Sequence, residues 1–486
     1  MATSAERPHG ALQRLGAPLA IAAGAVILRV LAGVGFANYD TLYALTWGGQ
    51  LARGETPQYG IPIAPTPHPL VEMLGVILSP LSPRAIEHVT VALGFLALSA
   101  CGWVVYRLGS VWFGRLAGAL AALILLTRVP VLSYGVRAYV DIPYLLLVLC
   151  ALLVESRHRA VEEGPAGAPV LVLLALAGLL RPEAWVFSGL YWLYLAFAGS
   201  KASRSQWALA RLALLAAAAP LLWVASDWLI TGHPLWSLTN TRHTATTLDR
   251  VTGIGNVPEY IPRRIGEILR PAVLAGAALG GVLSLWWLPQ RARLGAVMGV
   301  LAVVAFAAFA AFGLPINTRY AFLAATILCL FCGAGVFGWT RLAQADPRRR
   351  WWMAAGTLVL VALLASVPSQ YHSAHRELKK LAHQQSIQDE LLALVKDGAI
   401  TRRCEPVGVP NHAPIPLLAL YLETSPRKII SAEASPITSG TYVDPASKEV
   451  EEDYVLDPHD PHLPVTVPPG FTETHANRSW FIFEHC

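Results

Sequence analysis

Acidic residues that could take part in chemistry stand beside long apolar segments of this sequence. Asp40 follows the first apolar segment, and Asp141 stands at the start of the fourth. A carboxylate is costly to place near a membrane, so its presence there suggests function. An ionised carboxylate beside a hydroxyl group can take its proton as a general base. Asp40 is therefore our first candidate catalytic residue and Asp141 the second.

A structural interpretation of Asp40 also stays open. Tyr39, Tyr43 and Trp47 recur every four residues around it, which predicts an interfacial helix with an aromatic face. These rings would then form an aromatic belt at the membrane surface, with Asp40 as only a cap or turn residue of that helix. A Pro-rich loop and a second short apolar helix follow, so the segment 37–85 is predicted to lie at the membrane surface and not to cross it.

Asp141 has an equally ordinary interpretation. It precedes Ile142 and Pro143, an arrangement typical of a helix N-terminus. Arg137 lies four residues earlier and could pair with Asp141. Capping and catalysis therefore both remain possible for this residue.

Two arginines at segment ends are candidates for binding an anion. Arg319 and Tyr320 open the tenth apolar segment, where a guanidinium fork beside a phenol could hold a phosphate, although interfacial anchoring is the alternative. Arg181 in "LLRPEAW" precedes a helix start, which disfavours a cation and favours an anionic partner. Glu183, by contrast, suits the positive end of that helix dipole.

The remaining candidates for an outer cavity are polar residues near the same side of the segments. Asp227 lies in the last turn before Gly232, where a negative charge opposes the helix dipole, so a purely structural role is disfavoured. The others are His68, Arg137 and His233. No metal site is predicted, and the acid-rich segment "VDPASKEVEEDYVLDPHDPH" is interpreted as a solvated loop.

These residues must be positioned by membrane-spanning helices. The chain has 486 residues, of which 55% are hydrophobic and 14% charged, against roughly 25% charged in soluble domains. Apolar blocks long enough to cross about 30 Å of hydrocarbon predict an all-α polytopic membrane protein. We expect about eleven spans, near 17–36, 86–107, 113–131, 141–154, 169–180, 184–199, 208–230, 271–288, 294–312, 320–339 and 351–367.

The distribution of arginine predicts the orientation. A cytoplasmic N-terminus places most basic residues of the short links inside, as the positive-inside rule requires. This topology accounts for much of the net charge of +6, so nucleic acid is not an expected partner. The inner basic residues would be Arg7, Arg14, Arg107, Arg115, Arg157, Arg159, Lys201, Arg204, Arg211, Arg291, Arg293, Arg341 and Arg348 to Arg350.

The chain divides into a membrane domain, 1–368, and an extracytoplasmic tail, 369–486. The tail opens with an amphipathic helical pattern and continues with short strand-like runs such as "RKIISAE" and "SWFIFEH", which predict a small α/β domain. Cys404 and Cys486 both lie in this tail, where a disulfide is chemically permitted and slightly favoured over free thiols.

Taken together, these features resemble the GT-C superfamily of membrane glycosyltransferases, over roughly residues 17–340. The resemblance rests on the acid in a long first external loop, the Asp before the fourth span, the "LLRPEAW" segment, a Gly-x-Pro after the seventh span and the Arg-Tyr pair. The protein O-mannosyltransferases and the lipid A aminoarabinose transferase belong to this superfamily.

The resemblance implies a reaction and roles for the candidates. It implies transfer of a sugar from a polyprenyl-phosphate donor to a hydroxyl of a glycan, lipid or protein acceptor, with inversion at the anomeric carbon. Asp40 would be the base, Asp141 would support the acceptor or the loop, and Arg181, Arg319 and Tyr320 would hold the phosphate. Asp40 is followed by Thr-Leu-Tyr and not by a second acid, so a divalent metal stays only a possibility. A transporter or flippase of a lipid-linked anion is the alternative.

Overall fold

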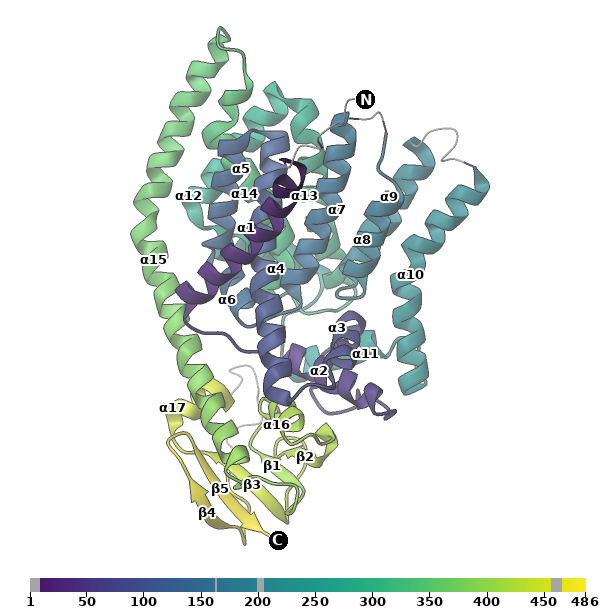
Figure 1. Cartoon of the computed structure of the whole chain (residues 1–486), viewed down its shortest axis with the longest axis vertical. Coiled ribbons are helices and arrows are strands. Elements are labelled where there is room, and N and C mark those ends of the chain that lie inside the picture. The colour runs from purple at the N-terminus through teal and green to yellow at the C-terminus, as the bar shows by residue number, and fades with distance from the viewer. Residues whose placement is uncertain (1–8, 162–163, 199–204, 456–465) are drawn as a thin grey trace, which may run out of the picture.

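The computed structural model describes the chain except for residues 1–8, 162–163, 199–204 and 456–465. Arg7, Lys201 and Arg204, used above for orientation, therefore lie outside the described residues. A bundle of long helices forms one part, and a small sheet with its helices forms the other (Figure 1). Short helices lie between the two parts.

A helix occupies each predicted span. The first half of the bundle contains α1 (His9–Ala32), α4 (Pro83–Trp112), α5 (Arg115–Leu126), α6 (Val129–Val136), α7 (Asp141–Val161), α8 (Ala168–Gly178) and α9 (Glu183–Ala198). The second half contains α10 (Gln206–Thr231), α12 (Val257–Trp287), α13 (Pro289–Ala311), η2 (Thr318–Ala321), α14 (Phe322–Phe337), η3 (Gly338–Arg341) and α15 (Pro347–Lys396). The short helices between the two parts are α2 (Tyr39–Ala52), α3 (Pro69–Leu78), α11 (Trp236–Thr247) and η1 (Ile254–Asn256).

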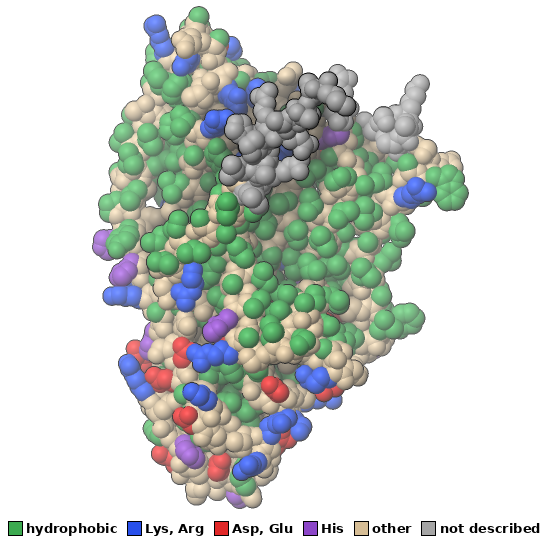
Figure 2. Space-filling view, in the orientation of Figure 1, with side chains coloured by type: hydrophobic (Ala, Val, Ile, Leu, Met, Phe, Trp, Pro, Cys, Tyr) green, Lys and Arg blue, Asp and Glu red, His purple; other side chains and the backbone are tan. Residues whose placement is uncertain are grey.

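The structure confirms a polytopic helical protein, whereas the count of eleven spans stays a prediction. Within the described residues, six helices are long and apolar enough to cross a membrane unaided, or seven if one bent pair counts as a single span. Hydrophobic side chains cover much of the bundle face that Figure 2 shows, and charged side chains gather above and below them.

The third predicted span is not one straight helix. It is broken into α5 and α6, which meet at 65°. Pro130 explains the break, because a proline inside a helix lacks the N–H donor and clashes with the preceding turn. Arg128 is buried at the break, where its Nε donates to the carbonyl of Ile124 at 3.1 Å.

The centre of the bundle is α14, which packs against α12 and α5 and is buried along almost its whole length. Gly276 and Gly280 of α12, spaced as in a small-xxx-small motif, let the two backbones approach closely. A Cβ atom at Gly280 would lie 1.8 Å from the carbonyl oxygen of Phe331, so a larger residue cannot fit there. Helix α14 follows directly on η2, the short turn that carries Arg319 and Tyr320.

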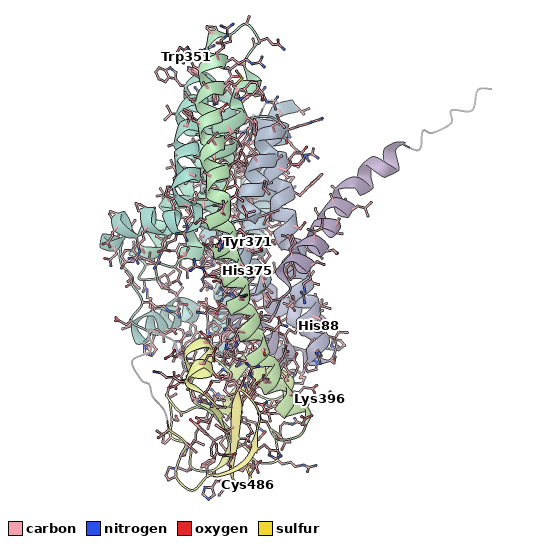
Figure 3. All side chains as sticks on the ribbon, turned by 90° about the vertical axis from the view of Figure 1, so that its left-hand side faces the viewer. His88, Trp351, Tyr371, His375, Lys396 and Cys486 are labelled. Carbon is pink, nitrogen blue, oxygen red and sulfur yellow. A yellow bond between two sulfur atoms is a disulfide. The ribbon has the colours of Figure 1, made fainter. Side chains whose placement is uncertain are left out.

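Helix α15 joins the bundle to the tail. It continues for 50 residues, through Pro368, so the predicted boundary at 368 lies inside one helix. Figure 3 shows it running from Trp351 past Tyr371 and His375 to Lys396 beside the tail.

The tail contains a five-stranded sheet of order β2-β1-β3-β5-β4, which agrees with the predicted small α/β domain. Its first three strands are parallel, and β3, β5 and β4 are antiparallel neighbours. Its elements are β1 (Val407–Val409), α16 (Ile415–Tyr421), η4 (Pro426–Lys428), β2 (Ile429–Ser431), β3 (Gly440–Pro445), α17 (Lys448–Val450), the π-helix η5 (Glu451–Val455), β4 (Thr472–Ala476) and β5 (Trp480–His485).

The aromatic stripe of α2 is not a lipid-facing belt. Tyr43 and Trp47 are fully buried, and the ring centroids of Tyr39 and Tyr43 lie 5.0 Å apart. These residues form one hydrophobic core with tail residues such as Leu417 and Trp480. The belt interpretation was wrong because α2 is covered by the tail, which lies hundreds of residues away in the sequence.

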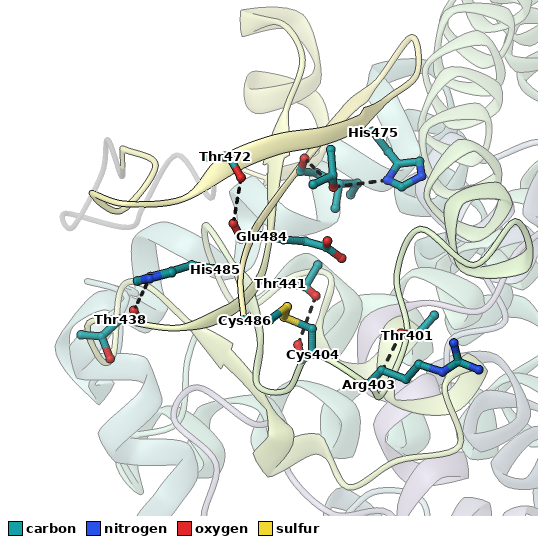
Figure 4. Close-up of a disulfide and its surroundings, with 12 residues drawn as sticks. Thr401, Arg403, Cys404, Thr438, Thr441, Thr472, His475, Glu484, His485 and Cys486 are labelled. Atoms are coloured by element: carbon teal, nitrogen blue, oxygen red, sulfur yellow. Dashed lines mark hydrogen bonds between the residues drawn. A yellow bond between two sulfur atoms is a disulfide. The ribbon is translucent and has the colours of Figure 1, made fainter.

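A disulfide between Cys404 and Cys486 closes the tail, as the sequence favoured (Figure 4). It ties the segment before β1 to the last residue, with a sequence separation of 82. A loop of that length predicts a stabilisation of about 4 kcal/mol, because the disulfide lowers the conformational entropy of the unfolded chain.

We expect Cys404→Ser to lower the free energy of unfolding of the tail by roughly this amount in urea titrations, while Cys150→Ser leaves it unchanged. Equal stability of the Cys404→Ser and wild-type proteins would contradict this.

Candidate functional site

A cavity of about 380 Å³ lies between the helix bundle and the layer of short helices. Its walls are mostly apolar, from α9, α10, α11 and the end of α13. The charged and aromatic residues on its walls are Tyr39, Asp40, His68, Arg181, Glu183, Trp185, Trp223, Asp227, Arg250, Phe309, Phe312, Arg319, Tyr320 and His412. Most of the predicted site residues therefore meet here.

Asp40 is not a cap, which removes the main structural interpretation of it. Asn38 caps α2, accepting hydrogen bonds from the backbone N–H groups of Asp40 at 2.8 Å and Thr41 at 3.3 Å. The Asp40 side chain is thus left to Arg319, whose Nη1 donates to Oδ2 at 2.8 Å. Burial alone would raise the pKa of Asp40, but the Arg319 guanidinium holds it below its usual value. Asp40 is therefore ionised at neutral pH.

Arg181 and Arg319 are both paired with acidic side chains of the protein. Arg181 donates to Asp141 and, from Nε at 3.1 Å, to Glu183. Arg319 Nη1 also lies 3.7 Å from Asp141 Oδ2. Asp141, only 2% exposed, thus bridges the two arginines. We call the five residues Asp40, Asp141, Arg181, Glu183 and Arg319 the acid–arginine cluster.

The predicted pairing of Arg137 with Asp141 does not occur. The Arg137 guanidinium donates to the Ser133 hydroxyl at 3.0 Å and lies over the rings of Tyr134 and Tyr139. Helix α7 begins at Asp141 itself, and the preceding turn directs Arg137 away from it. Asp141 is therefore free to reach across to Arg181 and Arg319, which come from other parts of the chain.

Tyr320 and His68 complete the polar end of the cavity. The Arg181 guanidinium lies 4.3 Å from the centre of the Tyr320 ring, so the phenol helps to hold this arginine. His68 Nδ1 lies 2.8 Å from the carbonyl oxygen of Leu180. Burial lowers the pKa of His68 to about 4, so this imidazole is neutral at physiological pH.

Two other predicted residues have mainly structural surroundings. Asp227 lies on the cavity wall, but both of its oxygens accept hydrogen bonds from Ser237, at 2.8 and 2.7 Å, and so fix the start of α11 against α10. His233 is exposed, stacks on Trp236 and is not among the residues that line the cavity.

The carboxylates of the cluster do not form an open metal site. Each of Asp40, Asp141 and Glu183 is already engaged by an arginine. Within the described part of the chain, the acidic and histidine side chains close enough to share an ion are His383, Glu449 and Asp453 in the tail region. An anion can therefore reach Arg181 or Arg319 only by displacing a carboxylate of the cluster.

A second cavity, of about 410 Å³, lies on the other side of Asp40. It is bounded by the end of α6, by α15 and by the tail, and we call it the tail-side cavity. It shares five lining residues with the first, which we call the bundle-side cavity. The shared residues are Tyr39, Asp40, Arg250, Arg319 and His412. Asp40 therefore stands at the boundary of two cavities.

Sequence reasoning missed His412 and left Arg250 without a role. His412 comes from the loop after β1, 372 positions after Asp40 (412 − 40), and packs edge-on against Tyr39 with ring centroids 5.4 Å apart. Nothing in the local sequence "PNHAP" marks it as part of a site. Arg250 was visible only as one of several arginines in the loop before α12.

No protein-family model and no curated protein matches this sequence. Among solved structures, the chain resembles ArnT from Cupriavidus metallidurans bound to undecaprenyl phosphate, with a TM-score of 0.54 and 14% identity over 96% of this chain and 98% of that one. It also matches an oligosaccharyltransferase of Archaeoglobus fulgidus in complex with Zn and sulfate, with a TM-score of 0.42 and 14% identity over 85% and 62% of the two chains. The first likeness extends over both parts of the molecule, so the chain has the GT-C fold that the sequence indicated.

Proposed function

We propose that this protein is an integral membrane glycosyltransferase that moves a sugar from a polyprenyl-phosphate donor to an acceptor hydroxyl. The observation that carries the proposal is the acid–arginine cluster at the head of a mostly apolar cavity. An isoprenoid chain needs apolar walls, and its phosphate needs a fork of guanidinium donors at the end of them. The similarly folded ArnT was solved bound to undecaprenyl phosphate, a ligand of this class.

The charges of the cluster suggest how the donor enters. Three carboxylates face two guanidinium groups, so the phosphate of the donor must compete with a carboxylate for an arginine. Arg319 is the best placed, because its Nε is buried without a hydrogen-bond partner among the described residues. When the phosphate binds Arg319, Asp40 loses its ion-pair partner and can accept a proton from the acceptor hydroxyl. Donor binding would thus prepare the base.

The reaction we propose is a direct displacement at the anomeric carbon. The acceptor oxygen forms a bond to that carbon as the carbon–oxygen bond to phosphate breaks, and Asp40 takes the hydroxyl proton. The phosphate leaves as polyprenyl phosphate with one more negative charge, which Arg319 and Arg181 stabilise. Attack from the face opposite to the phosphate inverts the anomer. Asp141 holds the two arginines in place.

We further propose that the site and the tail face the extracytoplasmic side, with the N-terminus in the cytoplasm. The site lies at the tail end of the bundle, and the arginines of the short links, such as Arg107, Arg115 and Arg341, lie at the other end. Positive residues are typical of the cytoplasmic end. A disulfide in the tail is also typical of an oxidising compartment.

A transporter or flippase of a lipid-linked anion is the competing function. Such a protein moves its substrate across the membrane without breaking a covalent bond. The acid–arginine cluster lies at one end of the bundle, beside a second cavity that leads toward the tail. This arrangement favours a reaction between two substrates over transport of a single substrate across the membrane.

The two functions are separated by incubating the purified protein with radiolabelled polyprenyl-phosphate sugars and a mixture of cell-envelope acceptors. We expect release of free polyprenyl phosphate and a product whose anomeric configuration is opposite to that of the donor. Movement of intact donor across proteoliposomes, with no polyprenyl phosphate formed from any donor, would contradict the proposal. A product with retained configuration would contradict direct displacement.

A further inference from the structure

The tail-side cavity lies at the edge of the sheet where parallel strands end. Strand β1 pairs in parallel with β2 on one side and β3 on the other. After β1 the chain turns through α16 toward β2, whereas after β3 it leads toward β4 and β5 on the opposite side. The ends of β1 and β3 therefore form a topological switch point, the place where open α/β sheets bind ligands.

The residues that follow these strand ends line the tail-side cavity. Asn411 and His412 come after β1, and Tyr454 comes after β3. His412 is held by Glu433 after β2, whose Oε2 lies 3.3 Å from Nδ1 and accepts the backbone N–H at 3.2 Å. His412 lines both cavities, so a ligand bound at this edge can reach Asp40.

Asn411 is a buried donor without a partner. Its side chain is only 1% exposed, and its Oδ1 accepts the backbone N–H of Ala413 at 2.9 Å. That bond orients the amide, while Nδ2 has no hydrogen-bond partner within the described residues. A buried unpaired donor is costly, which favours a bound group that accepts from it.

The lining as a whole is suited to hydroxyl groups. Of the 17 residues around the tail-side cavity, five carry carboxamides and four are tyrosines. Amides and phenols donate and accept hydrogen bonds, as sugar hydroxyls do, and the tyrosine rings offer apolar faces. The carboxamides belong to Asn38, Asn317, Gln384, Gln388 and Asn411.

The three arginines of the cavity are already engaged by other groups of the protein. Of its three arginines, Arg319 is paired with Asp40. Arg137 bonds to Ser133 and lies over two tyrosine rings. Arg250 is engaged as well. Asp40 is the one carboxylate among the described lining residues.

We propose that the tail-side cavity binds the acceptor, that the acceptor is an uncharged, hydroxyl-rich glycan, and that the C-terminal domain recognises it through Asn411 and Gln388. This inference rests on the proposed function, because it takes the bundle-side cavity as the donor site. A hydroxyl of the bound glycan would lie at the boundary of the two cavities, beside Asp40, while the remaining hydroxyls contact the amides of the tail.

Binding can be tested without turnover. The full-length protein in lipid nanodiscs is applied to an array of neutral glycans, acidic glycans and peptides. Binding of undecaprenyl phosphate is measured separately. We expect retention on neutral glycans, reduced about tenfold or more by Asn411→Ala and by Gln388→Ala, since loss of one buried hydrogen bond costs about 1.4 kcal/mol. Both variants should bind undecaprenyl phosphate like the wild type.

The matched control is Asn240→Ala, which removes the same amide from α11 outside the tail-side cavity and should leave glycan retention unchanged. Melting temperatures identify any variant that fails to fold, and Gln388→Ala then serves in place of Asn411→Ala. No retention of any glycan, retention of acidic glycans or peptides alone, or equal retention by variants and wild type would overturn the inference. Glycan retention without undecaprenyl-phosphate binding would instead contradict the proposed donor.

Discussion

Replacing Asp40 by asparagine is expected to abolish sugar transfer while leaving the protein folded and able to bind the donor. The amide has nearly the same shape as the carboxylate but cannot take the proton of the acceptor hydroxyl. Loss of a general base typically slows a reaction by about 10²- to 10⁴-fold. We expect kcat to decrease by about this factor or more. Donor affinity should be retained, because the donor phosphate no longer competes with the Asp40 carboxylate for Arg319.

The control for this variant is Ser82→Ala, since Ser82 caps α4 and lines neither cavity. Loss of an N-cap costs about 1 kcal/mol of stability, so this protein should melt earlier, yet the part that is folded should still transfer sugar. Asp141→Asn makes the same chemical change at the carboxylate that bridges the two arginines. It should weaken donor binding as well as turnover, because Asp141 orients both arginines. Near wild-type transfer by Asp40→Asn would remove Asp40 as the base.

Replacing Arg319 by alanine is expected to prevent donor binding. Arg319 contacts Asp40 and Asp141, and its Nε–H has no partner in the part of the chain that the structure describes, so it is the cation best placed to meet the phosphate. A charge-assisted bidentate contact of this kind predicts about a 100-fold or larger loss of affinity for undecaprenyl phosphate. Binding of the lipid in nanodiscs, titrated by isothermal calorimetry, measures this directly.

Arg319→Lys distinguishes charge from geometry. Lysine keeps the positive charge that Asp40 and Asp141 need, so the protein should remain folded even if the alanine variant does not. It lacks the planar fork of donors, and we therefore expect only partial recovery of donor affinity. Arg53→Ala is the neutral comparison, because Arg53 forms an exposed pair with Glu55 away from the cavities. Wild-type donor affinity in both Arg319 variants would exclude this residue from the donor site.

Hydropathy and local rules were enough for the outline of the fold. Apolar runs of fixed length predict helices whatever surrounds them, because every backbone polar group in a membrane must be paired within its own segment. The tail strands in "RKIISAE" and "SWFIFEH" were likewise visible from short-range patterns. Gly232 as the end of α10 follows from its left-handed backbone, with φ of 76°.

The membership of the site was partly predictable, because charged residues near apolar segments are rare and conspicuous. Asp40, Asp141, Arg181 and Arg319 could be selected on that ground alone. Apart from Glu183 beside Arg181, their partners could not, since Asp40 and Asp141 pair with arginines that are distant in the sequence. Arg137 was expected to meet Asp141, but the turn before α7 sends it to Ser133 and two tyrosine rings.

By itself, the sequence determined a polytopic helical membrane protein with a small α/β tail and acidic and basic residues gathered toward one end. Only the tertiary structure decided which of those residues meet. It placed the tail over α2, so that an apparent aromatic belt is a buried core, and it placed His412 at the boundary beside Asp40 and Asn411 in the tail-side cavity. The physical reason is that helix formation depends on neighbouring residues, whereas ion pairs and cavities depend on contacts between segments hundreds of residues apart.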